Sequence, residues 1–519
     1  MKGLYVHIPF CVRKCSYCDF YSLPDRQSAM SSYVQAVLQE AASFPLSQRG
    51  IKGDLQPPKN PAFQTLYLGG GTPSLLGPKN LQTLITGLSM LLVPYPLSGY
   101  STERSECREG QDEGVQKKGS GFRRPQPEVL GCYKPMYEPD RPNQTGQNKN
   151  VSPLAPGGEV PRMSRERETE RGGSSELQRT YEVVPFSHCE RSAAIRHRSS
   201  VLNPVFNGTN VSGKGGNSWA ESTLEANPES ATPEFLQTAK TLGFNRLSFG
   251  VQSFSDAELL SVGRIHTAAQ AVAAIKLAQK TGFQNISADL IIGLPGQTWH
   301  SLHNSMESLT GLGLPHLSIY CLSLENGTPL ALNPPNDLPS DDIQAELYEK
   351  TRAFLINAGF VHYEISNYAR PGFECRHNLN YWRGGEYLGL GPAAASHLDG
   401  KRFKNNNDLD AYLQNPAGQV EYVEELSPKD KAAEEAMLRL RLLEEGLNTD
   451  ELTAKFGSAN TSDIILRLDK MTQEQLLLQT GSTYRLSPAH ILTSNSIFSR
   501  VLGGEMGRTG VQTPEEGGL

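Results

Sequence analysis

The sequence lacks the features that mark membrane, secreted and disulfide-rich proteins. Its 519 residues contain no run of about 18 apolar residues, so no transmembrane helix is expected. Residues 1–10 lack the apolar core and the small-residue cleavage site of a signal peptide. Eight cysteines are too few for a disulfide scaffold in a chain of this length. We therefore expect a cytoplasmic protein in a reducing compartment.

An excess of positive charge is also missing. The chain has 49 Lys and Arg residues against 55 Asp and Glu residues, a net charge of −6. Nucleic-acid coating and polybasic membrane anchoring both need a basic surface. We therefore expect no nucleic-acid partner, whereas the acidic balance leaves peripheral membrane contact open.

Apolar residues are scarce as well, at 37% of the chain, and one segment accounts for much of the shortfall. Residues 97–217 are rich in charged residues, Gly, Pro and Ser, and they keep no helix or strand period for long. Such a segment buries too little apolar surface to offset the entropy lost on ordering. A low-complexity, disordered insertion is therefore predicted there, and the Gly-rich tail at 503–519 is also predicted to be disordered.

The rest of the chain alternates short apolar runs with amphipathic helical patterns, such as residues 268–281. The runs lie at residues 4–10, 65–70, 222–227, 245–253, 285–295 and 316–324. Six such units predict an α/β fold, a partial (β/α)6 TIM-like barrel with parallel strands. Polar residues at the carboxyl ends of the strands would then line the functional site.

The same patterns divide the chain into parts. The expected parts are the first part of the barrel at 1–96, the insertion at 97–217, the second part of the barrel at 218–335, a connecting region at 336–426, a C-terminal domain at 427–502 and the tail at 503–519. The C-terminal domain is predicted to be small, helical and winged-helix-like, because helical patterns with charged faces precede a short β pattern. Residues 363–387, rich in Tyr, Asn and Arg, are predicted to form an irregular, functional loop.

Cys11, Cys15 and Cys18 follow the first predicted strand with the spacing C-x3-C-x2-C. Three thiols so close together can bind one inorganic centre. A structural zinc site needs four ligands, and His7 belongs to the preceding strand rather than to the cysteine group. On a four-iron cluster, three cysteines would leave one iron open for a substrate or cofactor. A zinc site completed by a distant ligand, and unligated thiols, remain as alternatives.

The motif Y-V-H-I-P-F-C-x3-C-x-Y-C at residues 5–18 resembles the N-terminal signature of radical S-adenosylmethionine (SAM) enzymes. It is most similar to the branch that contains oxygen-independent coproporphyrinogen III oxidase and related heme chaperones. The resemblance covers residues 2–96 and continues from about residue 220 into the C-terminal domain. It implies a radical SAM barrel, a [4Fe–4S] cluster on the three cysteines, SAM on the fourth iron, and an electron donor that reduces the cluster.

The resemblance also implies a set of SAM-binding residues at the ends of the strands. Gly70, Gly71 and Thr72 would contact the methionyl part of SAM, because glycines allow close approach of the backbone. The other matching positions are Glu225, Gln252, Arg264 and Asp289, with Tyr5 and Tyr17 as aromatic neighbours of the cluster. Salt bridges at the mouth of the barrel, and core packing for the two tyrosines, are the alternatives.

Two features separate the branches of this family. The oxidase has an N-terminal extension and a further cysteine two residues past the cluster motif, whereas this sequence has ten residues before Cys11 and Phe20 at that place. Residues 376–382 contain H-N-x-x-Y-W, a motif associated with the chaperone branch, in which His377 would help bind heme. Cys375, close by, is expected to be buried, and Cys321 to lie in the core.

The resemblance thus implies a heme chaperone that binds heme and hands it to an unknown acceptor protein. An oxidative decarboxylase of coproporphyrinogen III is the first alternative. A radical SAM protein with another substrate is the second. For His377 the alternative is a buried, hydrogen-bonded residue that fixes the surrounding segment.

Overall fold

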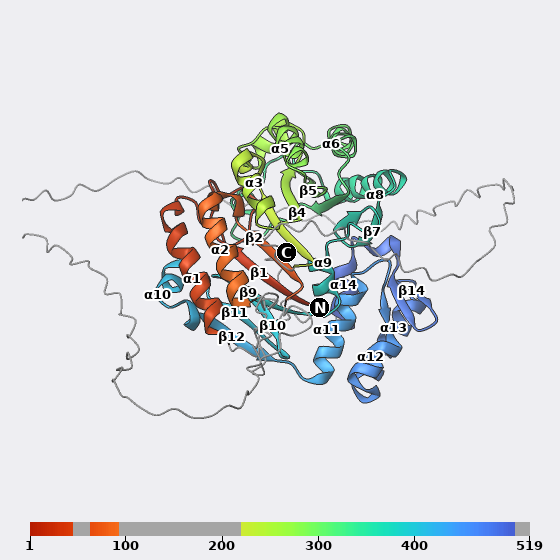
Figure 1. Cartoon of the computed structure of the whole chain (residues 1–519). Helices are drawn as coiled ribbons and strands as arrows, with labels where there is room; N and C mark the ends of the chain where they lie inside the picture. The colour runs from red at the N-terminus through yellow and green to blue at the C-terminus, as the bar shows by residue number, and fades with distance from the viewer. Residues whose placement is uncertain (45–62, 93–218, 504–519) are drawn as a thin grey trace, which may run out of the picture. The chain divides into compact units, whose positions relative to one another are not determined.

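The computed structural model describes residues 1–44, 63–92 and 219–503, which belong to one compact unit (Figure 1). The predicted insertion at 97–217 lies outside the described residues, as does the predicted tail apart from Gly503. None of the described helices is long and apolar enough to cross a membrane.

Six parallel strands in chain order form the centre of a twelve-stranded sheet. They are β1 (Lys2–Ile8), β2 (Thr65–Gly70), β3 (Glu221–Ala226), β4 (Arg246–Gln252), β5 (Asn285–Ile292) and β6 (His316–Cys321). In the order of the described strands, four strands lie between β1 and β6, which do not pair with each other, so this barrel is open. The predicted partial (β/α)6 barrel is thereby confirmed.

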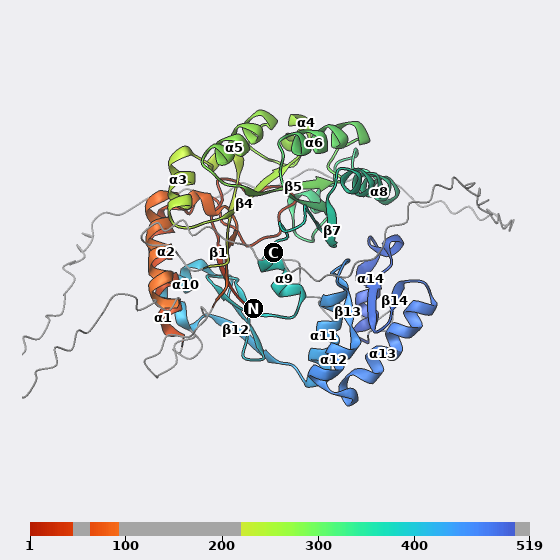
Figure 2. The same cartoon turned by 45° about the vertical axis from the view of Figure 1, so that its right-hand side comes forward.

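Helices follow these strands and cover one face of the sheet (Figure 2). They are η1 (Gln27–Ala29), α1 (Met30–Ser43), η2 (Pro73–Leu76), α2 (Gly77–Leu92), η3 (Pro228–Ser230), α3 (Pro233–Thr241), α4 (Asp256–Ser261), α5 (Ala268–Lys280) and α6 (Trp299–Gly311). The Thr267 side chain and the Gln270 side chain cap the start of α5 reciprocally, which explains why that helix begins where the sequence predicts.

Apolar and polar side chains alternate along the central strands, and this alternation determines which side chains face the site. In β1, Leu4, Val6 and Ile8 belong to the main hydrophobic core, whereas Tyr5 and His7 pair with each other outside that core. In β4 to β6 the polar alternates contact one another: Ser248 donates to Asp289, and Arg246 and Ser287 both contact His316. The barrel therefore has an apolar face toward its helices and a polar interior.

Strand ends depart slightly from the predicted ranges for local reasons. β2 occupies the predicted residues 65–70. β1 ends at Ile8 because Pro9 has no N–H to continue the ladder. β5 ends at Ile292 because Gly293 turns the chain with φ +92°.

The sheet continues beyond the predicted units on both sides. β9 (Glu386–Leu390) pairs parallel to β1 and is followed by antiparallel β10 (Ala395–Leu398), β11 (Lys401–Asn405) and β12 (Val420–Glu425). β8 (Asn367–Ala369) and β7 (Val361–Glu364) extend the side of β6. The helices of this region are α7 (Pro329–Leu332), α8 (Asp341–Asn357), α9 (Arg376–Trp382), α10 (Leu409–Gln414) and η4 (Pro416–Gly418).

The prediction of an irregular loop at 363–387 is wrong. This range contains the end of β7, all of β8 and α9, and the start of β9. Each of these elements has at most seven residues, so no period is long enough to be recognised in the sequence. Pairing with β6 and β1, which are distant in the chain, stabilises them instead.

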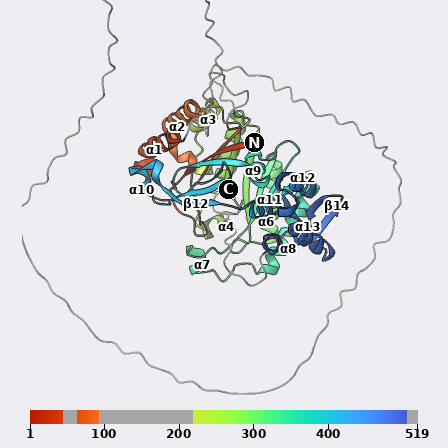
Figure 3. The same cartoon turned by 90° about the horizontal axis from the view of Figure 1, so that it is seen from below.

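The C-terminal part has the predicted winged-helix-like character (Figures 2 and 3). Its helices are α11 (Pro428–Leu440), α12 (Thr449–Phe456), α13 (Ser458–Gln473), η5 (Pro488–His490) and α14 (Ser494–Val501). A small sheet contains β13 (Leu447–Asn448), β15 (Thr483–Leu486) and β14 (Leu477–Thr480). Gly481, with φ +59°, turns the chain between β14 and β15. The predicted domain boundaries stay predictions.

Candidate functional site

The three clustered cysteines lie on the loop that leaves the carboxyl end of β1. Cys11 is buried, and Cys15 and Cys18 are half-buried. Backbone bonds fix the loop at separate points, among them Ser16 N–H to the Val262 carbonyl at 3.1 Å. Within the described ranges, no three or more His, Cys, Asp or Glu side chains gather as a single metal ion would require. The three thiolates of a four-iron cluster each bind a different iron, so they need not converge on one ion as the ligands of a zinc ion do.

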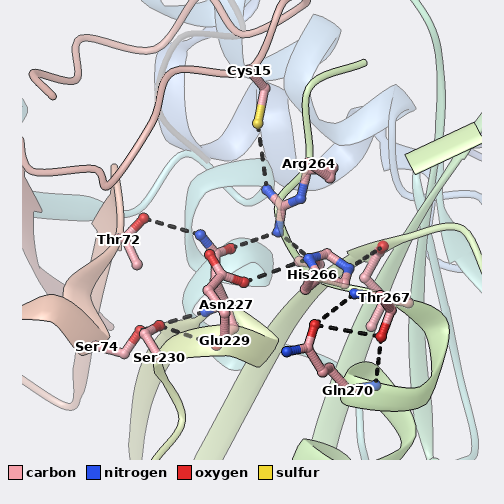
Figure 4. A network of polar contacts seen from close by, with 12 residues as sticks. Cys15, Thr72, Ser74, Asn227, Glu229, Ser230, Arg264, His266, Thr267 and Gln270 are labelled. Carbon is pink, nitrogen blue, oxygen red and sulfur yellow. Dashed lines mark hydrogen bonds and ion pairs between the residues drawn. The ribbon is translucent and has the colours of Figure 1, made fainter. Parts of the chain in front are cut away.

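Three polar side chains form a hydrogen-bonded series between Cys11 and Cys15. Figure 4 shows the part of this series from Thr72 to Cys15. The Thr72 hydroxyl donates to Cys11 Sγ at 3.5 Å and accepts from Asn227 Nδ2 at 3.1 Å. Arg264 Nη2 donates to Asn227 Oδ1 at 2.9 Å, and Arg264 Nη1 donates to Cys15 Sγ at 3.7 Å. Thr72 and Arg264, predicted separately, are thus joined through Asn227.

Asn227 is absent from the predicted site residues, although the sequence carries a signal for it. Asn227 and Pro228 directly follow β3, and an Asn-Pro pair marks a turn. The carboxyl end of a barrel strand is where site residues concentrate. Glu229 and His266 were missed in the same way; His266 Nδ1 lies 3.5 Å from Glu229 Oε2.

Gly70, the last residue of β2, and Gly71 after it are required by close packing against β1 and the segment that leads from β1 to Cys11. Gly70 has φ +105°, and a Cβ there would lie 2.7 Å from the His7 ring. A Cβ at Gly71 would lie 2.6 Å from the carbonyl oxygen of Phe10, the residue before Cys11. The glycine loop and the cysteine loop therefore pack directly against each other.

Two carboxyl groups lie in the polar interior near these loops. Glu225 accepts from the Tyr67 hydroxyl at 2.7 Å and from the Gly70 N–H at 3.2 Å. Asp289 accepts from the Ser248 hydroxyl at 3.4 Å. Burial is the main cause that raises the pKa of Glu225 to about 7 and the pKa of Asp289 to about 6. Both groups therefore change charge near neutral pH, as residues of functional sites often do.

Gln252, the last residue of β4, has an unusual backbone conformation. Its φ is +68°, and the pairing register with β5 shifts between Gly250 and Gln252. A non-glycine residue in this region costs about 1 kcal/mol or more and is typical of functional sites. The shift ends β4 beside Arg264, which donates to the Gly250 carbonyl at 2.6 Å.

The two predicted aromatic neighbours make the contacts expected for packing. The Tyr5 hydroxyl lies 3.0 Å from His7 Nδ1, and burial raises the pKa of Tyr5. Tyr17 packs against a small apolar cluster that includes Val262 and Leu294. Their contact with a cofactor stays a prediction.

His377 lies at the opposite end of the strands from the cysteines. Its Nδ1 is 2.8 Å from the hydroxyl of Thr65, the first residue of β2, and its N–H donates to Glu221, the first residue of β3, at 3.0 Å. Cys11 instead follows the carboxyl end of β1. The fold therefore separates the two motifs that the sequence analysis assigned to cofactors.

The His377 side chain is 1% exposed and fully hydrogen-bonded. Nε2 lies 3.1 Å from the Tyr381 hydroxyl, and the ring stacks on Tyr67 at 5.0 Å between centroids. Burial lowers the pKa of His377 to about 3. Trp382 is buried under the Arg441 guanidinium, 4.3 Å from its ring. These contacts agree with the alternative for His377, in which it is a buried, hydrogen-bonded residue that fixes the surrounding segment.

The two remaining described cysteines differ. Cys375 is buried, as expected, with its Sγ 3.5 Å from Glu221 Oε1. Cys321 is exposed, so its predicted place in the core is wrong. Cys321 is the last residue of β6, where pairing with β8 has ended and both Tyr320 and Cys321 are exposed.

Comparisons with known proteins agree on one superfamily. The Radical SAM superfamily model matches residues 190–309. The heme chaperone HemW of Lactococcus lactis is 25% identical over 505 residues, which cover 96% of this chain and 97% of that protein. The heme chaperone HemW of Haemophilus influenzae is 40% identical over 288 residues, 54% of this chain and 74% of that protein.

One solved structure is similar over nearly the whole chain. It is the Escherichia coli coproporphyrinogen III oxidase HemN, a radical SAM enzyme, with a TM-score of 0.63 and 17% identity. The match covers 96% of this chain and 89% of that one. At this identity the likeness shows a shared fold and leaves the choice of activity to other observations.

Proposed function

Because the chain belongs to the HemW family of radical SAM proteins, we propose that it is a heme chaperone, which binds heme and transfers it to an acceptor protein. The observation that carries the proposal is its similarity to the Haemophilus influenzae heme chaperone over most of that protein. The acceptor, an electron donor for the cluster, a cytoplasmic location and any membrane contact belong to the proposal as well.

We assign a [4Fe–4S] cluster to Cys11, Cys15 and Cys18. Three thiols on one loop, two of them already accepting hydrogen bonds, suit thiolate ligation of iron. The proposed SAM contacts are Tyr5, Tyr17, Gly70, Gly71, Thr72, Glu225, Gln252, Arg264 and Asp289. When bound and reduced, the cluster supplies one electron for the cleavage of SAM.

The chain's own groups would orient SAM by charge and hydrogen bonding. The Glu225 and Asp289 carboxylates suit ribose hydroxyls and an ammonium group, and the Arg264 guanidinium suits a carboxylate. Both acids are half-buried, so these contacts would be less screened by water than contacts on an open surface.

We propose His377 as the residue through which the H-N-x-x-Y-W motif contributes to heme binding. In the arrangement described, both of its ring nitrogens have partners. Iron ligation would require Nε2 to exchange the Tyr381 hydroxyl for iron, while Thr65 keeps hold of Nδ1. Tyr381 and Trp382 would offer aromatic surface to the porphyrin.

Coproporphyrinogen III oxidase activity is the second candidate. The motif at residues 5–18 favours it, because this motif resembles the signature of the branch that also contains the oxidase. Phe20, at the place of the further cysteine expected in the oxidase branch, argues against it.

An anaerobic turnover assay separates the two candidates. Reconstituted protein is mixed with SAM, a reductant and coproporphyrinogen III, and porphyrins and 5′-deoxyadenosine are quantified by mass spectrometry. We expect no decarboxylation by protein that holds a full cluster and binds heme in a titration. Protoporphyrinogen formed over many turnovers would overturn the chaperone proposal.

The cluster itself is tested by cysteine substitution. The triple variant Cys11→Ala, Cys15→Ala, Cys18→Ala should lose most iron and sulfide. Cys321→Ala is the matched control, since Cys321 is exposed on β6 and should leave the iron content unchanged. Near-stoichiometric iron in the triple variant would refute the assignment.

A further inference from the structure

Asn227 lies between the two side chains that donate to cysteine sulfurs. We propose that Asn227 is a positioning residue, which holds Thr72 against Cys11 and Arg264 against Cys15 and thereby tunes the reduction potential of the cluster. The inference rests on the proposed cluster and adds to it a residue and a task beyond heme transfer.

The donors and acceptors between Thr72, Asn227 and Arg264 follow from the chemistry of the three groups (Figure 4). A guanidinium has donors only, so the Asn227 oxygen must face Arg264, at 2.9 Å. The Asn227 amide nitrogen therefore faces Thr72 and donates to its hydroxyl oxygen at 3.1 Å. The Thr72 hydroxyl donates to Cys11 Sγ at 3.5 Å, and a thiolate that binds iron can only accept such a bond. One amide thus orients donors toward two different cysteines.

The backbone around Asn227 is held in place independently of any ligand. Asn227 precedes Pro228 and has the extended conformation that this favours, with φ −93° and ψ 147°. Its N–H donates to the Ser74 hydroxyl at 3.4 Å, which ties the end of β3 to the segment after β2. Gly250 leaves room for the amide, because a Cβ there would lie 3.1 Å from Asn227 Oδ1.

Arg264 is held equally firmly. Besides Asn227 and Cys15, it donates to the Gly250 carbonyl at 2.6 Å. These bonds use three of its five N–H groups, so two can still be donated to a ligand. A guanidinium is always protonated in proteins, so Arg264 brings a positive charge to this position.

Hydrogen bonds and positive charge at cluster sulfurs stabilise the reduced, more negative state and raise its reduction potential. Loss of Thr72 would affect only the Cys11 side, and loss of Arg264 only the Cys15 side. Loss of Asn227 would release both donors at once. An effect on both cysteines at once is what distinguishes a positioning role of Asn227 from simple packing.

The test uses the full chain, reconstituted anaerobically without SAM, and measures iron content and the cluster midpoint potential by redox titration monitored by electron paramagnetic resonance. Asn227→Ala should lower the potential, by about 59 mV if it makes reduction tenfold less favourable. Asn227→Asp should lower it further, because a carboxylate accepts the Thr72 proton, withdraws it from Cys11 and adds negative charge. An unchanged potential in both variants, with iron retained, would overturn the inference.

A matched pair at Thr72 keeps the inference testable if Asn227→Ala does not retain iron. Thr72→Ser keeps the hydroxyl and should keep the wild-type potential, whereas Thr72→Val should lower it; equal potentials in this pair would overturn the inference. Asn245→Ala is the control for loss of an amide elsewhere, since Asn245 precedes β4 at the other end of the barrel and accepts from Ser222 N–H. A wild-type chain that takes up no cluster would instead refute the proposed function.

Discussion

The Nδ1 atom of His377 lies 2.8 Å from the hydroxyl of Thr65 at the amino end of β2. Through this bond the short helix α9 is part of the barrel's interior packing, at the end opposite to Cys11. A heme held by His377 would therefore not lie beside the cysteine loop. Heme binding and cluster chemistry can then be altered separately by mutation.

We predict that His377→Ala lowers the free energy of unfolding by about 2–4 kcal/mol, because the Thr65 and Tyr381 hydroxyls lose buried partners. Iron content should not change, since α9 is distant from the cysteines. Urea denaturation, iron analysis and heme titration test this, with exposed His300→Ala as the control. Loss of heme binding at an unchanged unfolding energy would show instead that His377 acts purely as a ligand.

Gly71→Ala is expected to disturb the cysteine loop. The added Cβ would lie 2.6 Å from the Phe10 carbonyl oxygen, so the backbone next to Cys11 must shift. We expect a loss of about 1–3 kcal/mol in stability and reduced iron uptake. Gly311→Ala, at the end of α6 with no atom within 4 Å of the new Cβ, should retain wild-type iron content. Full iron uptake by Gly71→Ala would contradict the packing argument.

SAM affinity should rise with pH around neutrality. Burial raises the pKa of Glu225 to about 7, so this carboxyl is neutral below that pH and charged above it. If the carboxylate binds SAM, the dissociation constant measured at pH 8 should be lower than at pH 6. Glu225→Gln should flatten this dependence, whereas exposed Glu234→Gln should preserve it. An identical pH profile in wild type and Glu225→Gln would exclude Glu225 from SAM binding.

His7 should make the folded protein sensitive to acid. Burial lowers the pKa of His7 from 6.5 to about 4. Between these two pH values His7 is therefore protonated in the unfolded chain and neutral in the folded chain. Its contribution to stability is therefore lost as the pH falls from 6.5 toward 4, by about 2 kcal/mol at pH 5. Unfolding free energies at pH 7 and pH 5 should differ less in His7→Gln than in wild type. Equal differences in the two proteins would mean that His7 is not the group responsible.

Much of the barrel could be predicted because its signals are local. The apolar run at 65–70 ends in glycines, and β2 has those bounds. The cysteine spacing needs only eight residues to be recognised. The longer motif from Tyr5 to Cys18 was enough to indicate the family. In contrast, β8 has three residues and α9 has seven, too few to show a period, and both depend on strands far away in the chain.

Residue types and short spacings were enough to indicate the chemistry of this chain: thiols for iron, glycines for close approach, and polar groups where strands end. Which of these groups meet depends on the order of strands in the sheet, which brings distant segments together and is invisible in any local pattern. Thr72, Asn227 and Arg264 follow three different strands and meet only because β2, β3 and β4 are neighbours. The same strand order places His377 and Cys11 at opposite ends of the barrel, since one contacts the start of β2 and the other follows the end of β1.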